Sequence, residues 1–220
     1  MKKAFTLLEL IFVIIVIGIL TAIILPSTRR TPLQEAALQL VSHIRYTQHL
    51  AMMDDVLNPD DNIWYKKRWQ LVFSNAVAPD STVGYTIFSD TATGVGTSVA
   101  GDADMSEVAI NPQDSTKRLT GGYASAISST HAQVTKKLNL QLSYGIDRVD
   151  FDDGCNGGLR LFFDHNGRPM KGDQDSMTGG YSAGSQRLIT SLCTIVLYSG
   201  DRNISITVEP ESGYAAIKFQ

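Results

Sequence analysis

The chain begins with Met1-Lys-Lys-Ala-Phe-Thr-Leu-Leu-Glu-Leu10, continues through a largely apolar run to Leu25, and reaches Pro26. The 21 residues from Phe5 to Leu25 contain a single charged residue, Glu9. At about 1.5 Å of rise per residue, a helix of this length covers about 30 Å and can cross a bilayer. Because the lysines precede the run, we expect the amino end in the cytoplasm and the chain after Pro26 on the far side.

Glu9 requires an explanation, because a carboxylate inside a membrane helix costs roughly 2.5–3.5 kcal/mol on insertion scales. Its surroundings, Lys2-Lys3-Ala4 followed by Phe5-Thr6-Leu7-Leu8-Glu9 and the apolar run, closely resemble the N-terminal signal of type IV pilins and type II secretion pseudopilins. In that family a prepilin peptidase cuts before the aromatic residue and methylates the new amine. The resemblance implies cleavage between Ala4 and Phe5, although glycine is the family's usual residue before the cut.

The resemblance also implies a role for Glu9, which lies where the family has its glutamate, four residues after the new amine. Inside lipid each charge is costly alone, so both are stabilised when they pair within one subunit or between neighbours. We therefore predict that Glu9 acts in assembly and not in catalysis.

Two other classes of N-terminal segment fit less well. A plain secretory signal peptide has a shorter apolar core, no carboxylate in it, and a polar region with a cleavage site after it. An ordinary one-pass anchor explains the length of the run but not Phe5, Glu9 and their spacing.

Composition limits the rest of the chain to one globular domain after the N-terminal helix. The 220 residues are 43% hydrophobic and carry a net charge of −3. Removing Lys2 and Lys3 leaves 17 basic against 22 acidic residues, a net charge of −5, which argues against a surface built mainly for nucleic acid.

The cysteines, Cys155 and Cys193, follow the membrane segment, so a disulfide in an oxidising compartment is favoured over two free thiols.

The helical period returns after the Pro26 to Pro32 segment. Apolar residues recur at helical spacing from Leu33 to Ala51, and we expect this helix to end near Asp54, with the break at Asn58-Pro59-Asp60-Asp61. We therefore expect a leader at 1–4, a transmembrane helix at 5–25, an amphipathic extension at 26–58 and a periplasmic antiparallel β domain at 59–220. The predicted fold class is α+β, with the long helix packed on the sheet.

Alternating and apolar segments predict the strands of the β domain. Weak strands and long loops are expected between 74 and 135. The predicted strands are Trp69 to Phe73, Tyr85 to Phe88, Leu138 to Leu142, Leu159 to Phe163 before a turn at 164–167, and a closing meander of Cys193 to Tyr198, Ile204 to Val208 and Tyr214 to Phe219. The order of these parts resembles the minor pseudopilins of the H type and related minor type IV pilins.

The sequence also contains three candidate sites for chemistry or binding. Gly180-Tyr-Ser-Ala-Gly184 matches the serine-hydrolase elbow, but no buried strand precedes it and no histidine follows it, so no enzyme is expected. Acidic residues at 147–153, and Asp173 with Asp175, match no EF-hand spacing, so solvated turns are favoured. Asp173 and Asp175 remain the candidates if calcium binds, as it does in related major pseudopilins; no other cofactor is expected.

The third candidate is Lys66-Lys67-Arg68, a basic patch with aromatic neighbours that could contact phosphates. The sequence therefore leaves one main interpretation and two alternatives. The main one is a minor pseudopilin or pilin of the inner membrane, with a prepilin peptidase, other pilins, and a secreted substrate or outer-membrane secretin as partners. The alternatives are a DNA-binding minor pilin for transformation and an anchored β domain that never polymerises.

Overall fold

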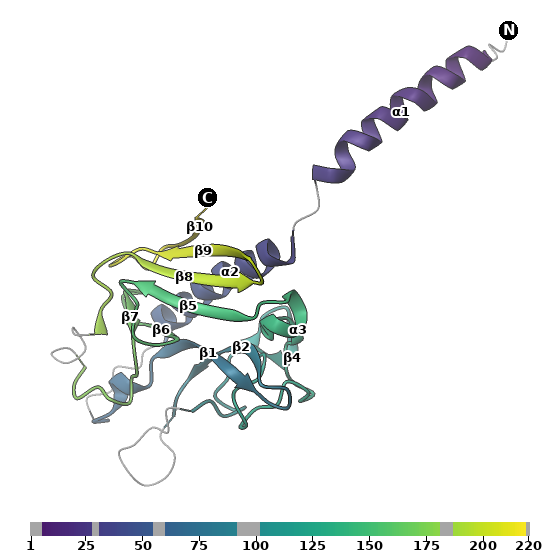
Figure 1. The fold of residues 1–220 in the computed structure, drawn as a ribbon. Coiled ribbons are helices and arrows are strands. Elements are labelled where there is room, and N and C mark those ends of the chain that lie inside the picture. Colours follow the sequence, from purple (N-terminus) through teal and green to yellow (C-terminus); the bar gives the residue numbers. More distant parts are fainter. Residues whose placement is uncertain (1–5, 28–30, 55–59, 92–101, 181–186, 219–220) are drawn as a thin grey trace. The chain divides into compact units, whose positions relative to one another are not determined.

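A computed structural model describes residues 6–27, 31–54, 60–91, 102–180 and 187–218, without the side chains of 22–27 (Figure 1). The chain forms two compact units, Met1–Thr31 and Pro32–Gln220, and each is described by itself.

The first unit contains helix α1, Leu7–Ser27. All of its described side chains, from Leu7 to Thr21, are exposed, although nearly all are apolar. The helix matches the segment predicted at 5–25 closely and includes Pro26 near its end. Within the described residues, we find no helix with both the length and the apolar character needed to cross a membrane.

Helix α2, Pro32–Met53, opens the second unit. Pro32 occupies the first helical position, where its missing N–H leaves no hydrogen bond unmade. These bounds agree with the helical period predicted from Leu33 and with the end predicted near Asp54. Residues 28–30 and 55–59 of the extension predicted at 26–58 lie outside the described residues. Its buried stripe agrees with the apolar period and also includes a threonine: Leu33, Ala36, Ala37, Leu40, Val41, Ile44, Thr47 and Ala51.

The second unit contains two four-stranded antiparallel sheets. The first has the order β2-β1-β6-β7, and the second has the order β10-β9-β8-β5. The first contains β1 (Trp69–Val77), β2 (Thr82–Ser89), β6 (Arg160–Phe163) and β7 (Pro169–Lys171). The second contains β5 (Arg148–Asp153), β8 (Cys193–Ser199), β9 (Arg202–Val208) and β10 (Ala215–Lys218).

Shorter elements complete the fold. They are the 3-10 turns η1 (Trp64–Lys66) and η2 (Lys136–Leu138), the hairpin of β3 (Ile110–Asn111) and β4 (Asp114–Arg118), and helix α3 (Leu140–Tyr144). The loops before and after the hairpin pack on the second face of β1 and β2, where Val72 and Phe88 form a smaller core with Val108 and Ile127.

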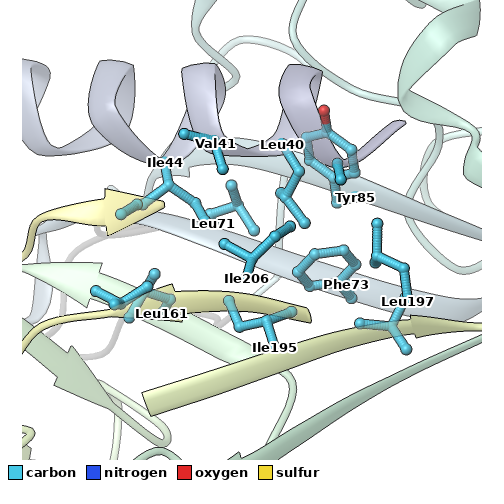
Figure 2. Close-up of a cluster of buried hydrophobic side chains, with 14 of the residues drawn as sticks. Leu40, Val41, Ile44, Leu71, Phe73, Tyr85, Leu161, Ile195, Leu197 and Ile206 are labelled. Carbon is cyan, nitrogen blue, oxygen red and sulfur yellow. The ribbon is translucent and has the colours of Figure 1, made fainter. Parts of the chain in front are cut away.

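The main core lies beneath α2 and joins both sheets (Figure 2). Leu40 and Ile44 of α2 belong to the same fully buried cluster as Leu71 of β1 and Ile206 of β9. Burying a side chain of this size contributes about 1.5–3 kcal/mol. The apolar stripe of α2 therefore explains why this helix packs on the domain.

The strand predicted at Leu138 to Leu142 is wrong. Residues 140–144 form α3, because Asn139 caps its start by accepting a hydrogen bond from the Leu142 N–H at 3.0 Å. Gly145 ends the helix with φ 68°, a left-handed conformation that glycine adopts at little cost. This local capping outweighs the alternation of leucines.

The interpretation of residues 147–153 as solvated turns is also wrong, since β5 occupies Arg148–Asp153. Val149 and Phe151 point into the main core, whereas Asp152 and Asp153 are exposed. β5 forms its backbone hydrogen bonds with β8. The acidic composition of this segment gave no indication of a strand. The predicted closing meander, in contrast, is confirmed as β8, β9 and β10.

Candidate functional site

The start of α1 holds Glu9 in a reciprocal set of hydrogen bonds with Thr6. The Thr6 amide and hydroxyl each donate to Glu9 Oε2 at 3.0 Å, and the Glu9 amide donates to Thr6 Oγ1 at 3.3 Å. This is a capping box, in which the first residue and the third helical residue satisfy each other's free backbone groups. The signal, a threonine followed three residues later by a glutamate, was present in the sequence but was overlooked.

The capping box bears directly on the predicted role of Glu9. It turns the carboxylate towards the beginning of the chain, and every described side chain beside it on α1 is exposed. Cleavage before Phe5 would leave both donors in place, because Thr6 would keep its amide and its hydroxyl. The processing residues themselves, Ala4 and Phe5, lie outside the described residues.

The three cations of the candidate DNA-binding patch face different protein groups. Lys66 Nζ lies 3.2 Å from Asp175 Oδ1, and Lys67 Nζ lies 2.5 Å from Asp61 Oδ2. The hydrogen bond from Lys67 lowers the pKa of Asp61. The patch is therefore not a row of cations turned together towards solvent.

Arg68 is buried, with only 3% of its surface exposed. Its guanidinium donates to Met170 Sδ at 3.0 Å and to the Gly180 carbonyl at 3.1 Å, and lies 5.7 Å from the centre of the Trp64 ring. Its backbone exchanges two hydrogen bonds of 3.1 Å with the side chain of Gln174. Arg68 thus fastens β7 and the loop after it, residues 172–180, to the beginning of β1.

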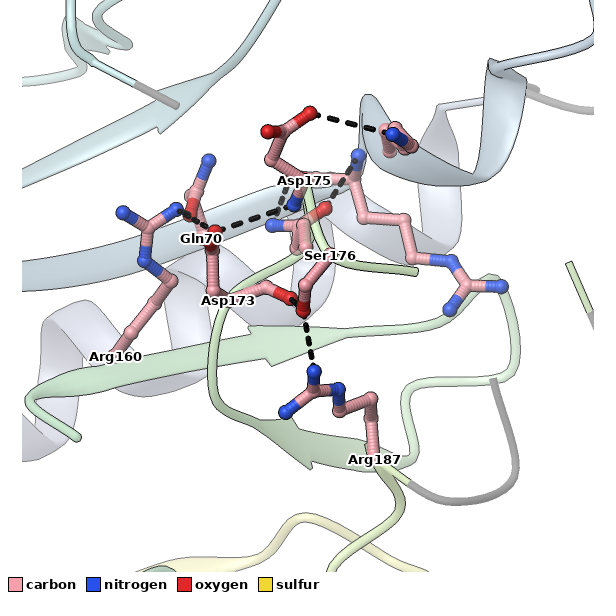
Figure 3. Close-up of polar contacts among 9 residues, drawn as sticks. Gln70, Arg160, Asp173, Asp175, Ser176 and Arg187 are labelled. Atoms are coloured by element: carbon pink, nitrogen blue, oxygen red, sulfur yellow. Dashed lines mark hydrogen bonds and ion pairs between the residues drawn. The ribbon is translucent and has the colours of Figure 1, made fainter. Parts of the chain in front are cut away.

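Asp173 and Asp175, the calcium candidates, lie in this same loop and face cations (Figure 3). Asp173 Oδ1 lies 3.5 Å from Arg160 NH1 and also accepts the Asp175 amide at 3.2 Å. Arg187 donates to the Ser176 hydroxyl and connects the loop to the chain that follows it. Among the described residues no group of three or more His, Cys, Asp or Glu side chains is arranged to hold a metal ion.

A disulfide joins Cys155 and Cys193, whose Cα atoms are 4.9 Å apart. Both residues are buried and belong to the main core. The bond connects the segment after β5 to the first residue of β8, so it closes one end of the second sheet.

A polar network under α2 was not predicted. The buried Tyr85 hydroxyl lies 2.6 Å from His43 Nδ1 and accepts from Gln39 Nε2 at 2.9 Å, and Tyr144 donates to Gln39 Oε1 at 2.9 Å. Burial lowers the pKa of His43 from 6.5 to about 4 and raises that of Tyr85. A groove of about 340 Å³ lies beside Gln39 and His43. Because Tyr85 is fully buried, we interpret the network as structural: it connects α2 to β2 of the first sheet.

Nothing can be said of the geometry of the hydrolase-like motif at 180–184, because residues 181–186 lie outside the described chain. Comparisons with protein-family models, with curated proteins and with solved structures found no match. The family resemblance of the N-terminal residues therefore remains a prediction from the sequence.

Proposed function

We propose that the chain is a structural minor subunit of a type II secretion pseudopilus or a type IV pilus, cleaved before Phe5 and N-methylated by a prepilin peptidase. The observation that carries this proposal is α1 itself. Its described side chains are exposed and apolar apart from Glu9 and Thr21, Thr6 caps it, and the residues before it match the prepilin signal. Such a surface requires lipid or the helices of other subunits to cover it.

In the proposed arrangement α1 crosses the inner membrane once and the second unit lies in the periplasm. The disulfide supports this placement weakly, because disulfides persist mainly in oxidising compartments. Growth of the filament then packs α1 helices together, and the β domain meets other pilins, secreted protein or the outer-membrane pore. A role in DNA uptake has less support, since Lys66 and Lys67 are already engaged by carboxylates.

Processing is tested by the intact mass of the chain after extraction from membranes of its host. We expect the mass of residues 5–220 plus one methyl group. An unmodified chain that still begins at Met1 would overturn the proposal and leave only an anchored β domain.

Assembly is tested by separating the charge of Glu9 from its capping role. Glu9→Gln keeps an oxygen that can accept from Thr6 but removes the charge, whereas Glu9→Ala removes both. If the amine–carboxylate pair drives assembly, both variants are inserted and cleaved, yet both are absent from sheared filaments. Glu35→Gln is the matched control, because Glu35 pairs with Lys137 on the surface of the second unit at 3.3 Å. Normal incorporation of Glu9→Gln would contradict the pairing and leave capping as the role of Glu9.

A further inference from the structure

The hairpin between β8 and β9 carries a sequence pattern that the proposed function does not use. Asp201-Arg-Asn-Ile-Ser205 contains an asparagine followed two residues later by serine, the acceptor pattern for N-linked glycosylation. Of the eight asparagines in the chain, Asn203 alone has this spacing.

The structure places the acceptor side chain where a glycan can be accommodated. Residues alternate along β9, so that Ile206 and Val208 enter the main core while Asn203 is on the opposite face of the sheet. Asn203 is exposed, and so are Asp201 and Arg202 beside it. Its cross-strand partner is Tyr198, whose ring lies 4.0 Å from the Arg148 guanidinium on the same face. A sugar attached here displaces no core residue.

Ser205 determines when the site can be recognised. In the folded domain only 7% of its surface is exposed, and β9 is paired on both sides there, with Val196 of β8 and Lys218 of β10. An enzyme that must contact the serine hydroxyl reaches it before these strands pair. The glycan is therefore added to the newly exported chain before it folds. The domain then folds with Ser205 buried and with the glycan on the exposed Asn203.

We propose that Asn203 is the acceptor of an N-linked glycan transferred from a lipid diphosphate-linked oligosaccharide. The carboxamide nitrogen of Asn203 forms a bond to the anomeric carbon of the first sugar and loses one proton. The bond from that carbon to the diphosphate oxygen breaks, and the lipid diphosphate leaves with the electron pair. No oxidant or reductant is required.

The proposal rests on the proposed function, because the transferase acts on the exported side of the membrane. It adds a constraint on the assembled filament. A glycan on Asn203 cannot be buried between subunits, so the face of the second sheet that carries Tyr198 and Asn203 is turned towards the outside of the filament.

The experiment expresses the full chain in bacteria with and without an oligosaccharyltransferase and its lipid-linked oligosaccharide. We expect one added glycan in the intact mass, at Asn203 by peptide mapping. The glycan should disappear in Asn203→Gln and in Ser205→Ala. Asn156→Gln is the control, because Asn156 is also exposed but lacks the acceptor spacing.

Export is measured in the same cells by protease access in spheroplasts and by the oxidation state of Cys155 and Cys193. An exported, oxidised domain without a glycan would overturn the acceptor assignment and leave the proposed function intact. A glycan that persists in Asn203→Gln would also overturn the assignment. A reduced domain that is shielded from protease would overturn the proposed function and the glycan site together.

Discussion

Single residues decide how the domain responds to acid, and His43 is the one with the largest expected effect. Its Nδ1 faces the buried Tyr85 hydroxyl at 2.6 Å, and burial lowers its pKa from 6.5 to about 4. Between those two values the unfolded chain binds a proton that the folded chain excludes. The free energy of unfolding should therefore decrease as the pH falls from 6.5 towards 4, by up to about 3 kcal/mol, and change little from this source below 4.

The measurement is the urea midpoint of the detergent-solubilised chain at pH 7 and at pH 4.5. His43→Gln should lose the part of the decrease that comes from this residue, while His49→Gln, an exposed position on the same helix, should keep it. Equal pH dependence in His43→Gln and the unchanged protein would show that another group causes the decrease.

Local spacing in the sequence identifies some of these side-chain contacts and not others. The Thr6–Glu9 capping box is local, three residues apart, and could have been predicted from the spacing alone. The partners of Lys66 and Arg160 come from the loop at 172–180, about 109 and 13 residues away in the chain. Since no local pattern specifies such pairs, the basic and acidic candidates appeared to be free surface groups before the fold was known.

Helix α3, which forms where a strand was predicted, depends on the side chain of Asn139. Asn139 is buried and uses both ends of its amide: Oδ1 caps α3, and Nδ2 donates to Thr82 Oγ1 at 2.7 Å and to the Gly121 carbonyl at 3.3 Å. Asn139→Ala removes the cap and leaves these buried acceptors without a donor. We expect a loss of about 2–4 kcal/mol in the free energy of unfolding.

This loss is measured by urea unfolding of the full chain in detergent, with Asn156→Ala as the control. Asn156 is exposed in a turn, so its variant should change stability by no more than about 0.5 kcal/mol. If Asn139→Ala were as mild as the control, the cap would not be what selects a helix at 140–144.

Elements with a long amphipathic period or with turns on both sides were predicted well, and elements that depend on distant pairing were not. The apolar stripe of α2 and the meander of β8 to β10 follow from period and turn chemistry in the sequence. β5 was missed because three of its six residues are aspartates, and its strand conformation requires β8, about 40 residues later. α3 was misread because alternation over five residues is too short to exclude a capped helical turn.

The disulfide is a covalent crosslink, so its effect on stability depends on the length of chain that it encloses. Cys155 and Cys193 are separated by 38 residues, and the chain between them contains β6, β7 and the loop that binds Arg68. A crosslink across a loop of this length lowers the entropy of the unfolded chain by an amount worth about 3–4 kcal/mol at 25 °C. The oxidised protein should therefore unfold at a clearly higher urea concentration than the reduced one.

The double variant Cys155→Ala/Cys193→Ala separates this effect from other actions of a reductant. Both side chains are buried in the main core, so the variant loses the crosslink and some packing, and its urea midpoint should be no higher than that of the reduced protein. Reductant should lower the midpoint of the unchanged protein and leave that of the variant unaltered. Thiol labelling gives the extent of reduction in each sample. Full reduction without a change in midpoint would contradict this prediction. It would mean that the two sheets and α2 hold this end of the fold without the crosslink. The disulfide would then indicate an oxidising compartment without stabilising the domain.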